Sequence, residues 1–199
     1  MTEIQRCPLS VLVRNEPGVL SRVAGLFARR GFNITSLAVG ETDDPKVSRI
    51  SLVVEADAPT LEQVVKQLQR LVSVIRVRDQ SRVSRVERGL VLVKVKVTPH
   101  QRGEVVHLVS IFRARVDHVD RDTMILEATG GREKIEAFVD MLRPYGIVEM
   151  ARTGQIVLAR GTTISQPSEA QSGPEEDEDL DLSYDEEDEP ETYNISKLE

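Results

Sequence analysis

Apolar and polar residues alternate along the first eighty positions with two different periods. Residues 9–13 alternate apolar with polar side chains, which is typical of a half-buried strand. In residues 19–27 the apolar side chains fall on one helical face, and Gly31 suits the end of that helix. Residues 34–42 and 47–55 alternate again around a polar turn, and together they predict a β-hairpin.

This order of elements is completed and then repeated. A helical face in residues 57–72 and an alternating segment at 74–78 give β-α-β-β-α-β, the ferredoxin-like order. The expected elements of a second unit are strands 90–97, 114–119, 123–129, 147–151 and 155–159 and helices 103–113 and 133–142. The sequence therefore predicts an α+β protein with two ferredoxin-like domains, residues 1–80 and 90–162, joined by a polar, basic linker at 81–89.

Charge divides the chain in a different way. The net charge of the whole chain is −7, but residues 165–199 alone carry 14 Asp/Glu and one Lys, so the remainder is mildly basic. With so little to bury, residues 163–199 are predicted to form a disordered acidic tail. Two roles stay open for it: keeping the protein soluble, or folding back on the basic body.

The compartment is predicted from the absence of certain signals. Cys7 has no second cysteine to pair with, which favours a reducing environment. The N-terminal residues show no signal-peptide pattern, and the apolar runs are far too short to span a bilayer. We therefore expect a cytoplasmic protein with no membrane partner.

Residue types that perform chemistry on this type of fold are missing. An RNA-binding version stacks bases on aromatic side chains of its central strands, and residues 11–13 and 47–52 contain none. A single cysteine excludes a copper carrier and an iron–sulfur protein. His100, His107 and His118 have no carboxylate or cysteine at ligand spacing. We therefore expect no catalytic residue and no metal site, which favours a binding or regulatory protein.

The turn between the first strand and the first helix is the best candidate for a binding site. Asn15 or Glu16 can cap the helix, and Pro17 suits its first turn. Gly18 leaves the first backbone N–H groups without side-chain cover, so that a carboxylate can reach the positive end of the helix. A well-capped helix without a ligand explains the same residues, and the turn alone does not decide between the two interpretations.

A series of short motifs keeps its order and spacing from about residue 8 to residue 161. The motifs are Asn15-Glu16-Pro17-Gly18-Val19-Leu20-Ser21-Arg22-Val23, Gly25-Leu26-Phe27, Arg30-Gly31-Phe32-Asn33-Ile34, Thr42-Asp43-Asp44-Pro45, Val93-Lys94-Val95, Ile111-Phe112-Arg113 and Ala151-Arg152-Thr153-Gly154. In these motifs the chain closely resembles the regulatory (small) subunits of acetolactate synthase, also called acetohydroxyacid synthase. The acidic tail departs from that family pattern.

The resemblance implies that residues 1–80 are an ACT domain, which binds an amino acid and forms a homodimer, and that the second domain is ACT-like. The implied effector is a branched-chain amino acid (valine, leucine or isoleucine), held between the first strand–helix turn of one protomer and the start of the second strand of its neighbour. The residues carried over are Asn15, Gly18, Val19 and Leu20 from one protomer and Asn33 and Ile34 from the other.

The resemblance also implies a regulatory subunit with no activity and no cofactor of its own. Its partner would be the catalytic large subunit, which in this family uses thiamine diphosphate, Mg²⁺ and FAD. One alternative is a stand-alone ACT-type amino-acid sensor that acts on another partner. A second alternative is nucleic-acid binding by the basic stretch 76–88, although solvated linker charge explains that stretch more simply, and we expect no nucleic-acid partner.

Overall fold

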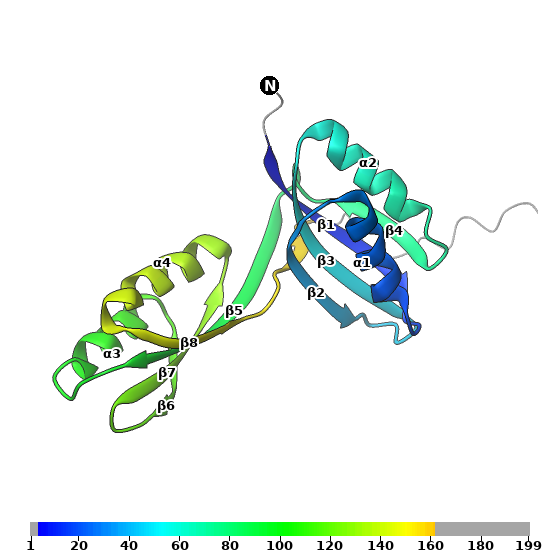
Figure 1. Ribbon diagram of the computed structural model, residues 1–199. Helices are drawn as coiled ribbons and strands as arrows, with labels where there is room; N and C mark the ends of the chain where they lie inside the picture. The colour runs from blue at the N-terminus through cyan, green and yellow to red at the C-terminus, as the bar shows by residue number, and fades with distance from the viewer. Residues whose placement is uncertain (1–3, 162–199) are drawn as a thin grey trace, which may run out of the picture. The chain divides into compact units, whose positions relative to one another are not determined.

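The computed structural model describes residues 4–161, which form two antiparallel sheets with helices packed on one face of each (Figure 1). The first sheet contains β1 (Gln5–Arg14), β2 (Ile34–Glu41), β3 (Val47–Ala56) and β4 (Val74–Asp79), and its helices are α1 (Val19–Arg30) and α2 (Ala58–Gln69). The strand order β2-β3-β1-β4 is that of the ferredoxin-like fold. The predicted tail, residues 163–199, lies outside the described residues.

The second sheet repeats the arrangement. It contains β5 (Arg85–Lys96), β6 (Arg115–Val119), β7 (Thr123–Gly130), β8 (Ile147–Arg152) and β9 (Ile156–Ala159), with helices α3 (Arg102–Ile111) and α4 (Arg132–Leu142) and the 3₁₀ turn η1 (Arg143–Tyr145). Its order is β6-β7-β5-β8, and β9 pairs with β5 outside this path. The predicted α+β architecture with two ferredoxin-like domains is confirmed.

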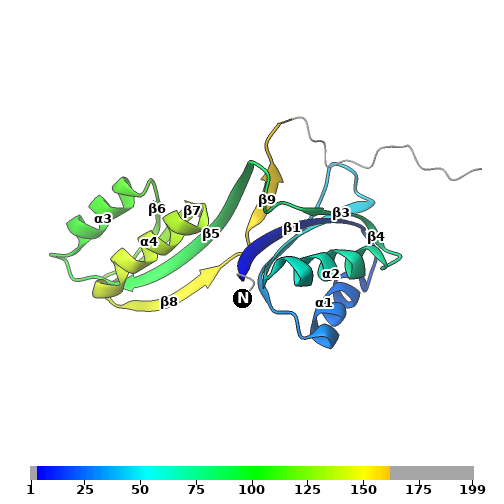
Figure 2. The same ribbon diagram turned by 90° about the horizontal axis from the view of Figure 1, so that it is seen from above.

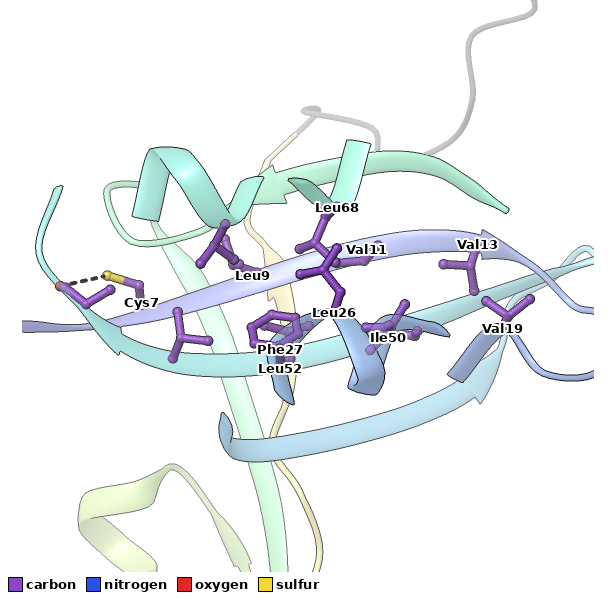
Figure 3. Close-up of a cluster of buried hydrophobic side chains, with 14 residues drawn as sticks. Cys7, Leu9, Val11, Val13, Val19, Leu26, Phe27, Ile50, Leu52 and Leu68 are labelled. Carbon is purple, nitrogen blue, oxygen red and sulfur yellow. Dashed lines mark hydrogen bonds between the residues drawn. The ribbon is translucent and has the colours of Figure 1, made fainter. Parts of the chain in front are cut away.

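Each domain buries its own apolar core between its sheet and its helices. In the first domain, Leu9 and Val11 of β1 and Leu52 of β3 meet Phe27 of α1 and Leu68 of α2 (Figure 3). In the second domain a separate cluster forms around β5, β7, α3 and α4. Because alternate strand residues face the helices, the period-two pattern of the sequence accounts directly for these cores.

Strand β1 is buried on both faces, so the prediction of a half-buried strand is wrong here. Ser10 and Leu12 point away from the helices, yet each is only 3% exposed. The guanidinium group of Arg49 donates to Ser10 Oγ (3.0 Å) on this face. The backbone N–H of Val157, in β9, donates to Ser51 Oγ on the same face (3.4 Å). The end of the second domain therefore contributes to covering the first sheet.

Strand β5 begins inside the segment that was predicted to be a linker, residues 81–89. Its first four residues, Arg85–Arg88, pair with β9, and the remainder pairs with β7 and β8. The prediction that this strand starts at residue 90 is therefore wrong. The polar pattern concealed the strand because its partner lies about seventy residues further along the chain.

Within residues 4–161, no helix has the length and apolar character needed to cross a membrane.

Candidate functional site

The turn before α1 is glycine-capped. The helix begins at Val19, and Gly18 is its N-cap residue with a left-handed backbone (φ 80°). No side chain caps this helix end in the described structure, so the prediction that Asn15 or Glu16 does so is wrong. Pro17 lies just before the first turn and not inside it. A left-handed N-cap is readily adopted only by glycine, which explains why glycine occupies this position.

Asn15 joins this turn to the hairpin turn between β2 and β3. Its Nδ2 donates to Pro45 O (2.9 Å) and to Glu41 Oε1 (3.2 Å), and its backbone N–H donates to Lys46 O (2.7 Å). The side chain is exposed. Because an amide offers two N–H donors and one carbonyl acceptor, these bonds leave Oδ1 as the atom that can receive a further donor.

The first turn of α1 is open to an anion. The N–H of Val19 makes only a long bond to Glu16 O (3.4 Å), and the regular helical bonds begin with Arg22 N donating to Gly18 O (3.0 Å). The intervening N–H groups have no intrahelical partner. The first turn of α1 contains no acidic residue. A Cβ built on Gly18 meets nothing within 4 Å, so no neighbouring atom covers the side-chain position of this residue.

The two aliphatic residues that follow the turn point in different directions. Val19 is 4% exposed and belongs to the core of the first domain, so it offers a ligand only its backbone. Leu20 is 43% exposed. Of these two side chains, Leu20 is therefore the one that can contact a ligand at this turn.

The structure does not bring Asn33 and Ile34 to Gly18 within one chain. Asn33 is exposed and lies just before β2, and Ile34 is half-buried and is the first residue of β2. This strand begins beyond the C-terminal end of α1 (Figure 1). With 12 residues, α1 separates them from Gly18 by about 18 Å at 1.5 Å per residue. A site that uses both groups requires two copies of the chain.

In the second domain the N-cap residue of α3 is Gln101, and no side chain caps that helix end either. Gln101 Oε1 accepts hydrogen bonds from the N–H of Thr98 (3.1 Å) and from its hydroxyl group (2.9 Å). Glu104 lies in the first turn of α3. Its negative charge is favourable at the positive end of the helix and would repel an anion there. The difference from the first domain is therefore this acid, since the equivalent position in α1 is Ser21.

Metal-ligating residues do not cluster in residues 4–161: no group of three or more His, Cys, Asp or Glu side chains could hold an ion there. His118 Nε2 lies 3.3 Å from Asp120, but both side chains are more than half exposed. The turn before α1, with its uncapped and acid-free helix end, is the candidate site in the described part of the chain.

Two ferredoxin-like units in tandem, one with an open glycine turn, define a protein of the ACT-domain class. Residues 9–76 match the family described as the AHAS small subunit-like ACT domain, and residues 88–161 match the family described as the small subunit of acetolactate synthase. The chain therefore belongs to the acetolactate synthase small subunit family, as its motifs predicted. Residues 162–199 lie outside both matches.

Individual acetolactate synthase small subunits are also similar to this chain. The acetolactate synthase small subunits of Mycolicibacterium smegmatis and Mycobacterium bovis are 46% and 48% identical to this chain over 153 residues. These matches cover 77% of this chain and 90% and 91% of those proteins. The crystal structure of the small subunit from Thermotoga maritima has a TM-score of 0.74 at 42% identity, covering 79% of this chain and 99% of that one.

Proposed function

We propose that this chain is the regulatory subunit that binds the catalytic large subunit of acetolactate synthase, raises its activity and makes it sensitive to branched-chain amino acids, valine above all. Family membership over both domains supports the partner. The uncapped, acid-free start of α1 supports the effector and is the observation that carries the proposal. The chain itself performs no chemistry; thiamine diphosphate, Mg²⁺ and FAD would belong to the large subunit.

Each part of a bound amino acid has a matching group. Its carboxylate is received by the N–H groups that follow Gly18, where the helix end favours an anion by about 0.3–2 kcal/mol. Its ammonium group donates to Asn15 Oδ1. Its aliphatic side chain contacts Leu20, and Asn33 and Ile34 of a second protomer close the site. Because one methylene group is worth only about 1–3 kcal/mol, valine, leucine and isoleucine are expected to be separated incompletely.

Regulation follows from a ligand held between two protomers. A ligand that fits one packing of the dimer better than another shifts the equilibrium between them. Allosteric couplings are typically about 1–3 kcal/mol, which is a 5- to 150-fold change in affinity. In this chain the bonds of Asn15 to Glu41 and Pro45 link the binding turn to the β2–β3 hairpin, so that a ligand on the turn acts directly on the sheet.

The test is the rate of the large subunit, with and without this chain, at increasing valine concentration. We expect activation by the free chain and loss of that activation with valine. Gly18→Glu should still activate but should no longer respond to valine, because it adds a negative charge and a side chain at the anion site. Gly146→Glu is a matched control, since Gly146 also has a positive φ (83°) and no neighbour within 4 Å of its Cβ position.

Two outcomes contradict the proposal. If the chain changes the rate neither alone nor with valine, the regulatory assignment is wrong. If Gly18→Glu keeps the full valine response, the effector binds elsewhere. Valine binding without any effect on the large subunit would instead favour the stand-alone sensor.

A further inference from the structure

We propose that three arginine side chains of the first sheet, those of Arg49, Arg76 and Arg78, bind the phosphate group of a small molecule. The three residues lie in β3 and β4. None of them belongs to the turn before α1 or to the start of β2, so this site is distinct from the proposed effector site. The proposal goes beyond the proposed function, because a free amino acid carries no phosphate group.

The register of the strands brings the three arginines to one face of the sheet. Residues that pair across antiparallel strands point to the same side. Leu12 of β1 pairs with Arg49 of β3 and, on its other side, with Arg76 of β4. Ser10, two residues before Leu12, pairs with Arg78. Because Ser10 and Leu12 point away from the helices, all three arginines lie on the face opposite α1 and α2; Figure 2 shows both helices on the other side of the sheet.

Arg49 reaches across β1 towards Arg78. Its Nη1 donates to Ser10 Oγ (3.0 Å), and Ser10 is the residue that pairs with Arg78. The α-carbons of Arg49 and Arg76 are separated by two strand spacings, about 10 Å. All three arginines are half-buried, as is typical when the aliphatic part of the side chain covers apolar surface and the charged end stays in water. The three guanidinium groups therefore gather around Ser10 and Leu12, within reach of one ligand.

The positive charge of this cluster exceeds the negative charge beside it. Like charges on neighbouring strands repel each other. Burial and the charge of Arg78 lower the pKa of Arg49, and the carboxylate of Asp43 raises it by a smaller amount. The second domain differs, because Arg115 of its edge strand β6 pairs with an acid, Glu127. An anion bound among the arginines of the first sheet would relieve their repulsion.

The space beside β4 and the chemistry of the arginines indicate the class of ligand. A hollow of about 410 Å³ follows β4 and is lined by Arg76, Arg78 and Gln69 of α2. β4 is an edge strand, and an edge strand has outward-facing N–H groups that the sheet does not use. A phosphate ester carries a charge of about −1.5 to −2 at neutral pH and three acceptor oxygens. Guanidinium groups match these oxygens with paired N–H donors, and several cations favour a phosphate over a singly charged carboxylate.

The experiment is isothermal titration calorimetry of the full-length chain with glycerol 3-phosphate, inorganic phosphate and acetate, at low ionic strength because salt screens such contacts. We expect both phosphates to bind more tightly than acetate. Arg78→Gln should raise the dissociation constant of glycerol 3-phosphate about tenfold or more, as for the loss of a charge-assisted hydrogen bond. Arg115→Gln is the matched control and should change it little, because it removes the same charge from an edge strand outside the cluster.

Two further measurements accompany the titration. The amide NMR signals of Ser10 and Leu12 should shift as glycerol 3-phosphate is added, which places the ligand on this face of the sheet. Far-UV circular dichroism checks that the variants are folded, and Arg76→Gln replaces Arg78→Gln if that variant does not fold.

Three results overturn the proposal. The wild type does not bind either phosphate; or Arg115→Gln weakens binding as much as Arg78→Gln, which indicates attraction to the overall charge; or acetate binds as tightly as the phosphates. If a peptide of consecutive glutamates binds this face and the phosphates do not, the arginines receive a protein segment and the proposal is also wrong. Titration with valine tests the effector site separately: phosphate binding without valine binding supports this site and contradicts the proposed function.

Discussion

Gly154 precedes β9 and packs closely against β2, which makes it the most informative position for a single substitution. A Cβ added there overlaps the backbone carbonyl group of Leu37 and lies 2.8 Å from the backbone N of Ala38, closer than real Cβ atoms approach other atoms. Both neighbours are backbone atoms of a strand, so they cannot turn aside as a flexible side chain would. In Gly154→Ala the segment before β9 must therefore move away from β2.

The cost of this movement has two parts. Overpacking a well-packed site costs about 1–3 kcal/mol. The movement also strains the bonds of Gln155, whose N–H donates to Ser36 Oγ (2.8 Å) and whose Oε1 accepts from Arg6 (2.8 Å). Each such bond contributes about 0.5–1.5 kcal/mol, and Gln155 is buried, so weakened bonds are not replaced by water. We expect Gly154→Ala to lower the free energy of unfolding by about 2–4 kcal/mol.

The assay is urea unfolding followed by far-UV circular dichroism, with hydrogen exchange at the Gln155 and Val157 amides as a local measure. Gly103→Ala is the control. Gly103 lies in α3 with nothing within 4 Å of its Cβ position, and alanine in a helix is favoured over glycine by about 0.5–1 kcal/mol. An alanine at position 154 that changes stability by less than about 0.5 kcal/mol, with unchanged exchange at both amides, would refute the reasoning.

Two further predictions concern helix ends and ion pairs. α1 and α3 each end in a left-handed residue, Gly31 (φ 69°) and Arg113 (φ 47°). Arg113→Gly should therefore stabilise the protein by about 0.5–1 kcal/mol and Gly31→Ala should destabilise it by about 1 kcal/mol in thermal unfolding, and shifts of the opposite sign would contradict this. The hydrogen bond from Lys66 and its charge lower the pKa of Glu62, so the benefit of this pair is present above the ordinary carboxyl pKa and disappears as the pH falls through the lowered one. Lys66→Met should raise the Glu62 pKa in an NMR titration, and an unchanged titration curve would count against the pairing.

The position of the candidate site was predicted from the sequence, but the hydrogen bonds that shape it were not. Gly18 stood out because it leaves the first N–H groups of the helix without side-chain cover, and the family resemblance favoured a ligand site over a plain helix start. The cap was misassigned because Asn15 is a good N-cap residue in isolation, whereas in the folded chain its amide is taken by Glu41 and Pro45, at least 26 positions away. The pairing of Asn33 with Gly18 across two protomers stays a prediction.

The order of elements and the two separate cores were determined by the sequence alone, because the spacing of apolar residues along a strand or helix reports directly which side faces a core. The burial of the second face of β1 and the extension of β5 to Arg85 were decided only by tertiary structure. Both depend on β9, which follows some seventy residues after Arg85 and bonds to Ser51. Hydrogen bonds between segments so far apart leave no period in the local sequence, so no local pattern could have predicted them.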